Sequence, residues 1–396
     1  MWSAIFFFGV ALTLWGCAHY YIGRRIMGSV RDKERAIRWL WILLGAHFVL
    51  VPVGMFMRRF IEVEPFYTII QWAAYLGMGA FTLLLVLMVI KDLLWLVYLL
   101  GARVAVARRS RGEEELGDAG RRLFMTNAMN ATVITAAAAG TKYGLYEARK
   151  LPDVVDVEIP VAGLAPDLDG FHIVQLSDIH VGPTIRRATV EAIVERVNEL
   201  GADIIVITGD LVDGHVQELW EEVEPITHLR ARHGLFFCTG NHEYYWDAPA
   251  WCRTLEEGGI RVLNNAHHLV VHGRGRLLVA GCTDYSAGRH ILEEASDPVK
   301  AMAGAPDHDF SLLLAHHPKS IFKAGEAGFD LQLSGHTHGG QFWPWNHVVG
   351  LVHPFSAGLE RHEKTWIYVS RGTGYWGPPM RIGAPSEITS IRLKVS

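Results

Sequence analysis

The spacing of hydrophobic residues divides the chain into two parts. In the first part, apolar residues run almost without interruption over residues 3–22, 37–57 and 66–90. The third run continues past Lys91 and Asp92 to residue 100, either as one long helix that emerges into the interface or as an additional short span. Because about 20 apolar residues in a helix cross the hydrocarbon core of a bilayer, the pattern predicts about three transmembrane helices within residues 1–110.

From about residue 154 the apolar runs become short and alternate with amphipathic stretches. They predict strands at residues 154–161, 171–177, 203–208, 235–239, 277–282, 310–315, 329–334, 365–370 and 387–394. The stretches between them predict helices at 184–200, 217–231, 249–258, 290–304 and 320–328. Alternating strands and helices are typical of an α/β domain, in which ligands gather at the carboxyl ends of strands. We therefore predict an α/β domain over residues 151–396.

The charged residues follow the same division. Residues 1–150 carry 18 basic and 10 acidic side chains, a net charge of +8, whereas residues 151–396 carry 19 basic and 31 acidic side chains, a net charge of −12. Eighteen of the 20 histidines lie in the acidic part. A domain rich in carboxylates and imidazoles suits cations and lacks the basic face that nucleic acid requires, so no nucleic-acid partner is predicted. The four cysteines show no Cys-x-x-Cys spacing and predict neither a zinc knuckle nor a disulfide framework.

Basic residues in the loops predict the orientation of the helices. Arginine and lysine gather after the first apolar run, at residues 24–38, and after the third, at residues 103–122. The connection between the second and third runs has only Arg58 and Arg59 as basic residues, beside two glutamates. The positive-inside rule then places both basic loops in the cytoplasm. If the segment after Arg122 is a last span, the domain after residue 150 is predicted on the outer, non-cytoplasmic face of the cytoplasmic membrane.

Residues 111–150 resemble a twin-arginine export signal in an internal position. Arg121 and Arg122 are followed by Phe124 and then by a weakly apolar, Ala- and Thr-rich run to about residue 140. We interpret the segment as this signal with a last span or linker, and the alternative is a basic cluster before an amphipathic helix. The alanines at 136–138 also fit a small-residue cleavage site, which leaves open whether the domain stays tethered.

Five short polar blocks follow predicted strands of the second part, each at or next to a carboxyl end. They are Ser177-Asp178-Ile179-His180, Gly209-Asp210-Leu211-Val212-Asp213, Gly240-Asn241-His242-Glu243, Ala315-His316-His317-Pro318 and Gly335-His336-Thr337-His338-Gly339-Gly340. An Asp and a His two residues apart can reach the same ion, and glycine lets backbone come close to an ion or anion. Turn chemistry explains any single block, since Asp is common in turns. It does not explain five blocks in one domain, which together predict a metal centre.

In this order the blocks resemble the motifs of the calcineurin-like metallophosphoesterases, in particular a branch of membrane-associated members. The resemblance covers roughly residues 150–396 and implies a four-layer αββα sandwich after the N-terminal transmembrane helices. It also implies two divalent metal ions as cofactors. By this resemblance, the first ion would be held by Asp178, His180, Asp210 and His338, and the second by Asp210, Asn241, His316 and His336. Such donors accept Mn, Fe, Zn or Ni, and the residues do not distinguish among these metals.

The resemblance also implies a reaction. Asp210 would bridge the two ions, and a water between them would lose a proton and attack the phosphoester. His242 would lie beside the phosphate and protonate the leaving oxygen or stabilise charge. The implied activity is hydrolysis of a phosphomonoester or phosphodiester by a metal-bound hydroxide.

Four residues near the blocks are weaker candidates. His317, next to the proposed ligand His316, and the two arginines Arg371 and Arg381 are predicted to contact the phosphate of the substrate. Structural salt bridges are the alternative for the arginines. Asp213 is interpreted as a turn residue or a support for the ligands rather than as a ligand itself.

Aromatic residues follow the same blocks and bear on the substrate. Three aromatic residues at positions 244–246 follow the third block, and Trp343 and Trp345 follow the fifth. They form either core packing or an apolar rim for an amphiphilic phosphoester at the bilayer surface, where indole and phenol rings are favoured. The predicted substrate is a phosphomonoester or phosphodiester, and a lipid-linked one fits the membrane setting. The alternatives are hydrolysis of the pyrophosphate of UDP-2,3-diacylglucosamine, whose cytoplasmic location conflicts with the predicted orientation, and a non-catalytic metal-binding module.

Overall fold

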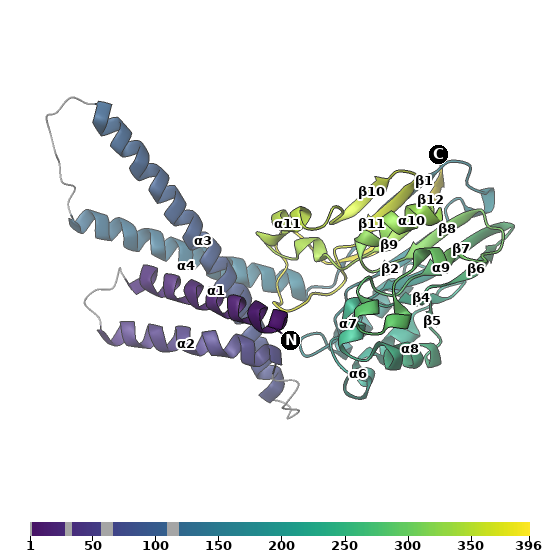
Figure 1. Cartoon of the computed structure of the whole chain (residues 1–396), viewed down its shortest axis with the longest axis horizontal. Helices are drawn as coiled ribbons and strands as arrows, with labels where there is room; N and C mark the ends of the chain where they lie inside the picture. The colour runs from purple at the N-terminus through teal and green to yellow at the C-terminus, as the bar shows by residue number, and fades with distance from the viewer. Residues whose placement is uncertain (1, 28–33, 57–65, 109–118) are drawn as a thin grey trace. The chain divides into compact units, whose positions relative to one another are not determined.

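The computed structural model describes residues 2–27, 34–56, 66–108 and 119–396 (Figure 1). Clustering of contacts divides the chain into two compact units, one up to Tyr143 and the other from Gly144 to Ser396. The first unit is helical and the second is built on β-sheets. Six of the 14 basic residues used to predict orientation lie outside the described residues, namely Arg31, Lys33, Arg58, Arg59, Arg109 and Arg111.

Long apolar helices make up the first unit. They are α1 (Trp2–Met27), α2 (Glu34–Phe56), α3 (Phe66–Arg108) and the first part of α4 (Ala119–Arg149). Among the described residues, three helices are long and apolar enough to cross a membrane, namely Phe6–Met27, Glu34–Met55 and Phe66–Gly101. The third predicted run is one continuous helix without a break at Lys91 and Asp92, so the first of the two alternatives is correct. The weakly apolar run after Arg122 is helical and lies within α4.

Two six-stranded sheets form the framework of the second unit. The first has the strand order β1-β12-β2-β3-β4-β5, and the second has the order β10-β11-β9-β8-β7-β6. The strands of the first sheet are β1 (Asp153–Val161), β2 (His172–Leu176), β3 (Ile204–Thr208), β4 (Leu235–Cys238), β5 (Arg261–Val262) and β12 (Glu387–Val395). Those of the second are β6 (Ala266–His272), β7 (Gly275–Gly281), β8 (Phe310–Leu314), β9 (Leu331–Ser334), β10 (Gly358–His362) and β11 (Thr365–Val369). Strands β2 to β5 pair in parallel, as do β7, β8, β9 and β11.

Alternating side chains of the strands build three hydrophobic layers, because successive residues in a strand point to opposite faces. Ile204 and Val206 of β3 belong to the core between the two sheets, whereas Ile205 and Ile207 belong to the core under the helices. The helices that pack against the first sheet are α5 (Arg187–Asn198), α6 (Val216–Val223) and α8 (Ala248–Glu257). The second sheet is covered by α9 (Pro298–Met302) and α10 (Ile321–Ala327). This is the predicted four-layer αββα sandwich after N-terminal apolar helices.

Differences from the predicted elements lie mainly at the edges of the sheets. All nine predicted strands are present, but β5, β6 and β10 were not predicted because they are short or half-exposed and carry polar residues. The helix predicted at 290–304 is wrong: the chain forms a 3₁₀ turn at Leu292–Glu294 and the five-residue helix α9. Pro298 explains the break, since it fits the first turn of a helix but not its interior.

Candidate metal centre

The predicted ligands lie on loops that leave both sheets at the carboxyl ends of strands. Asp178 and His180 follow β2, Asp210 follows β3, and Asn241 opens α7 (Asn241–Tyr245) after β4. From the second sheet, His316 follows β8, and His336 and His338 follow β9. Carboxyl ends of neighbouring parallel strands share one edge of a sheet, so the two stacked sheets bring five loops to one place. The structure thus brings together all seven residues predicted to bind metal.

Three of these side chains, Asp178, His180 and His338, form one group of close donor atoms. The Nε2 atoms of His180 and His338 are 3.1 Å apart, and His338 Nε2 lies 3.4 Å from Oδ1 of Asp178. Two imidazole ligands of one tetrahedral ion, each about 2.0–2.1 Å from it, are separated by about 3.3 Å. The observed distances therefore match a shared cation.

A second group consists of Asp210, His316 and His336, with Asn241 beside them. His316 Nε2 lies 3.1 Å from Oδ2 of Asp210, and His336 Nδ1 lies 3.2 Å from His316 Nε2. The Oδ1 atom of Asn241 is 2.9 Å from the same nitrogen of His336. Oδ2 of Asp210 is also 3.8 Å from Nε2 of His180 in the first group. One carboxylate oxygen therefore faces both groups.

Hydrogen bonds fix the orientation of the imidazole rings. His316 Nδ1–H donates to the carbonyl oxygen of Thr208 at 2.8 Å, which leaves the lone pair of Nε2 directed at Asp210. Arg381 Nη2–H donates to Nδ1 of His338 at 3.1 Å. The His316 contact is the kind that holds a histidine ligand for a metal ion, because the ring donates its other N–H to the protein. The Arg381 contact fixes only the orientation of the His338 ring.

The backbone is strained at the same positions. Five predicted ligands have φ in the left-handed region: Asp178 at 53°, His180 at 56°, Asp210 at 52°, His336 at 71° and His338 at 51°. Non-glycine residues adopt this conformation rarely, at a cost of order 1–3 kcal/mol each, and such residues cluster at functional sites. The loops are also packed closely together: a Cβ atom on Gly335 would lie 2.0 Å from Oδ2 of Asp178, so only glycine fits at this position. The strained backbone therefore lowers the stability of the fold, but it directs these side chains toward one point.

Two acidic residues of the motifs organise the loops. The sequence predicts no role for Glu243, and it predicts that Asp213 is a turn residue or a support for the ligands. Glu243 is fully buried and accepts hydrogen bonds from the backbone N–H groups of Asp210, Leu211 and Gly240 at 3.0, 2.8 and 2.6 Å. Burial, followed by the charge of Asp210, raises the pKa of Glu243 to about 7. The only sign of this supporting role in the sequence is the position of Glu243, which follows an Asn-His pair a few residues after a buried strand.

Asp213 supports two histidines. Its Oδ1 accepts a short hydrogen bond from Nδ1 of His242, and its Oδ2 lies 3.4 Å from Nδ1 of His180. Burial by itself lowers the pKa of His242, but the carboxylates of Asp210 and Asp213 outweigh burial and raise this pKa to about 9. The Nε2 atom of His242 lies 3.9 Å from Oδ2 of Asp210. His242 thus presents one nitrogen to the centre, as its predicted role requires.

Comparisons with known proteins agree with this geometry. The family model described as calcineurin-like phosphoesterase matches residues 171–340, which contain all five blocks. A Danio rerio protein named transmembrane protein with metallophosphoesterase domain is 37% identical over 94% of this chain and 84% of its own length. The Bos taurus protein of the same name is 35% identical over 100% of this chain and 91% of its own length. This chain belongs to the calcineurin-like phosphoesterases.

The calcineurin-like phosphoesterase domain makes the protein a metal-dependent hydrolase that acts on phosphoester bonds. The names of the two relatives, together with the three apolar helices, indicate that it is associated with a membrane. Among solved structures, a 5'-nucleotidase precursor from Thermus thermophilus is similar with a TM-score of 0.36 and 14% identity, over 56% of this chain and 54% of that chain.

The three candidate substrate contacts of the phosphoesterase differ in their surroundings. Arg371 pairs with Oε2 of Glu387 at 2.8 Å. Arg381 is fully buried and donates to backbone carbonyls of Gly374 and Arg371 as well as to His338, so its guanidinium faces the protein interior. Arg371 thus has the structural salt bridge that the alternative interpretation predicted, whereas the contacts of Arg381 are hydrogen bonds to backbone carbonyls and to a histidine. His317 is half-buried, and its ring lies 4.4 Å from that of His336, at the edge of the centre.

Aromatic rings of the phosphoesterase domain partly surround His242. The rings of Tyr245 and Trp376 lie 5.1 and 5.7 Å from that of His242, and their exposed fractions are 55% and 47%. Tyr244 is buried instead, and its hydroxyl donates to Glu294. The aromatic residues are thus divided between an exposed rim and the core.

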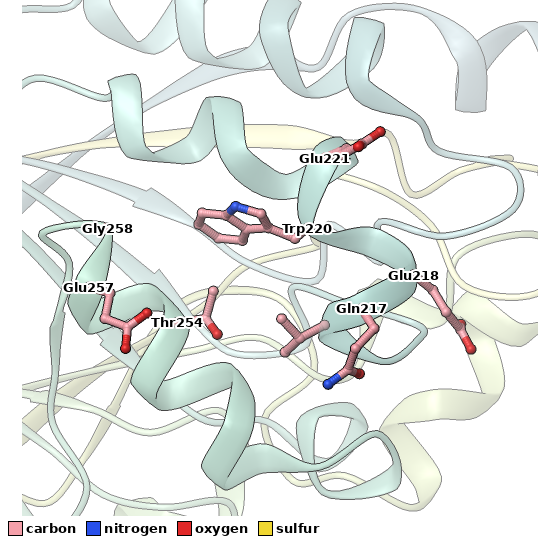
Figure 2. A pocket seen from close by; sticks show the side chains of 8 residues that line it. Gln217, Glu218, Trp220, Glu221, Thr254, Glu257 and Gly258 are labelled. Atoms are coloured by element: carbon pink, nitrogen blue, oxygen red, sulfur yellow. The ribbon is translucent and has the colours of Figure 1, made fainter.

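A separate surface pocket of about 690 Å³ lies between α6 and α8 (Figure 2). Figure 2 shows Trp220 among its lining residues, with the carboxylates of Glu218, Glu221 and Glu257. None of the predicted metal ligands lines this pocket, and it is not part of the candidate metal centre.

Proposed function

We propose that the seven clustered residues hold two divalent cations, with Asp210 shared between them. The first cation would bind Asp178, His180, Asp210 and His338, and the second would bind Asp210, Asn241, His316 and His336. The shared position of Asp210 Oδ2, which faces His316 at 3.1 Å and His180 at 3.8 Å, carries this proposal. The donor set fits borderline cations such as Mn, Fe, Zn or Ni, because it combines imidazoles with carboxylates. When bound, two such cations neutralise the phosphoryl group and supply a hydroxide nucleophile near neutral pH.

His242 is proposed as the general acid of the reaction. Asp213 holds its Nδ1, so Nε2 is the atom that can deliver a proton to the oxygen of the leaving group. Backbone N–H of His242 also donates to Oδ1 of Asp210 at 2.8 Å, which ties the acid to the shared ligand. Oδ1 of Asp210 is therefore engaged with the backbone, while Oδ2 faces the two groups of donors.

The substrate is proposed to be an amphiphilic phosphoester, and a lipid-linked one fits best. The exposed rings of Tyr245 and Trp376 beside His242 offer a surface on which an apolar chain of the substrate can pack next to its phosphate. The apolar helices of the first unit support a setting at a bilayer. Aromatic rings favour the membrane interface, so the same residues would help the domain to work there.

Hydrolysis by the full-length protein tests this proposal. The Mn²⁺-loaded protein is expected to cleave an aryl phosphodiester or an aryl phosphomonoester, and to deplete a phosphorylated species when incubated with total membrane lipids and followed by mass spectrometry. Cleavage of soluble esters without any change among the lipids would contradict the lipid substrate alone. A metal-loaded protein that cleaves neither class of ester would contradict the hydrolytic centre and favour a binding module.

The catalytic domain is proposed to lie outside the cytoplasm, on the opposite side of a multi-pass membrane region from the basic loops. Fusion of alkaline phosphatase after residue 150 is expected to give an active reporter, because this enzyme gains activity only after export. Fusion after residue 108, on the predicted cytoplasmic side, is the matched control and should be inactive. The opposite pattern would overturn both the orientation and the twin-arginine interpretation of Arg121 and Arg122.

A further inference from the structure

A second cluster of potential ligands lies in the phosphoesterase domain at the other end of the sheets. Asp203, His233 and His272 offer three ligand atoms that all lie within 4.8 Å of one another. Asp203 immediately precedes β3 and Asp210 follows it. Seven residue steps at about 3.3 Å each separate the two aspartates by roughly 20 Å. The cluster is therefore remote from the candidate metal centre.

We propose that Asp203, His233 and His272 form a metal site that binds one Zn²⁺ or a similar borderline divalent cation. Asp203 and His233 precede β3 and β4 of the first sheet, and His272 ends β6 of the second sheet. A cation held by all three would join the two sheets directly. This is a stabilising site, separate from the hydrolytic one.

The distances are close to those that zinc needs. His233 Nε2 lies 3.0 Å from His272 Nδ1, and His272 Nδ1 lies 3.8 Å from Oδ1 of Asp203. Ligand bonds of about 2.0–2.2 Å in a tetrahedral arrangement separate neighbouring donors by about 3.3–3.5 Å. A change of a few tenths of an ångström in each of these two distances would meet this geometry. Two imidazoles and one carboxylate, with water in the fourth position, are a donor set that zinc accepts.

The ligands are already held in place by their neighbours. The backbone N–H of His172 donates to Oδ2 of Asp203 at 2.9 Å, which turns Oδ1 toward the histidines. The ring of Phe171 stacks on His233 and meets His272 edge-on, with ring centroids 6.1 and 5.2 Å apart. All three proposed ligands are half-buried, so a cation can reach them from solvent.

Arg232 competes for the carboxylate. Its Nη1 lies 3.3 Å from Oδ1 of Asp203, and its side chain is 66% exposed. An exposed guanidinium can turn into water when a cation arrives, because such surface pairs contribute little. The proposal therefore predicts that Arg232→Gln tightens Zn²⁺ binding by about 2- to 5-fold, since an exposed pair opposes the cation only weakly.

Zinc titration of the full-length protein tests the site. The unchanged protein should bind one more equivalent of Zn²⁺ than His272→Ala, as counted by elemental mass spectrometry after gel filtration. Its unfolding temperature should rise with Zn²⁺ by about 5–10 °C at a concentration 100 times the dissociation constant, and this additional rise should be absent in the variant. The control is His228→Ala, which removes a histidine with 61% exposure outside the cluster and should change neither value. Phosphoesterase activity should be unaltered in both variants.

The measured quantity is the difference of one equivalent of bound Zn²⁺ between the unchanged protein and His272→Ala. It does not depend on how many ions the hydrolytic centre holds. If His272→Ala does not fold, His233→Ala gives the same comparison. Equal zinc content in the unchanged protein and the folded variant, or an Arg232→Gln variant that binds Zn²⁺ no more tightly, would overturn the site and leave a hydrogen-bonded histidine pair.

Discussion

Replacing Asp210 with asparagine is expected to lower kcat/KM by about 10³-fold or more, because several kcal/mol of charge stabilisation disappear with the shared carboxylate. Asparagine has nearly the same shape, and its carbonyl oxygen can still accept the hydrogen bond that Asp210 Oδ1 takes from the backbone of His242. The loop should therefore remain in place. The side chain would no longer offer the negatively charged oxygen that faces both His180 and His316.

Metal content distinguishes this explanation from general damage. Asp210→Asn should bind fewer divalent ions than the unchanged protein under the same loading, while its thermal unfolding shows a folded domain. Asp153→Asn is the control, because Asp153 has a side chain that is 60% exposed and lies at the start of β1. Activity within tenfold of the unchanged protein, with full metal content, would refute the shared-ligand proposal for Asp210.

Replacing His242 with glutamine should lower kcat by about 10²- to 10⁴-fold, the contribution typical of a positioned acid or base. Glutamine has a similar length but cannot donate a proton at neutral pH in the way that imidazolium can. The loss should depend on the leaving group. An alkyl phosphoester, whose alkoxide leaves poorly without a proton, should suffer the full loss, and a nitrophenyl ester should lose much less.

Two further measurements, one on His242→Gln and one on Asp213→Asn, make the result specific. The variant should retain the metal content of the unchanged protein, because His242 is not among the proposed ligands. Asp213→Asn should show a smaller loss with the same dependence on leaving group, since Asp213 acts by holding Nδ1 of His242. Equal losses on alkyl and nitrophenyl esters would show that His242 does not act as the acid.

The pattern of hydrophobic residues determined much of the architecture. The long apolar runs predict α1, α2 and α3 because about 20 apolar residues in a helix match the thickness of the hydrocarbon core of a bilayer. The short runs predict the inner strands, which are buried on both faces and therefore continuously apolar. The half-exposed strand β6 was not predicted because His267 and His268 interrupt its pattern of apolar residues.

The sequence also determined which residues gather at the candidate metal centre. Each predicted ligand directly follows a buried strand or lies within a few residues of its end, and the strand direction decides the edge of the sheet at which it emerges. Local order in the chain is therefore enough to place Asp178 near Asp210, and His316 near His338, once the strands of each sheet are known to be parallel. The stacking of the two sheets is what joins these pairs.

Only the tertiary structure decided which groups support or surround that centre. Arg381 lies about 200 residues along the chain from Asp178, and nothing in its neighbours signals that its guanidinium is buried against His338. The cluster of Asp203, His233 and His272 joins the beginnings of two strands to the end of a third in the other sheet. Such contacts depend on how two sheets stack, and stacking is set by side-chain packing between segments that are distant in sequence.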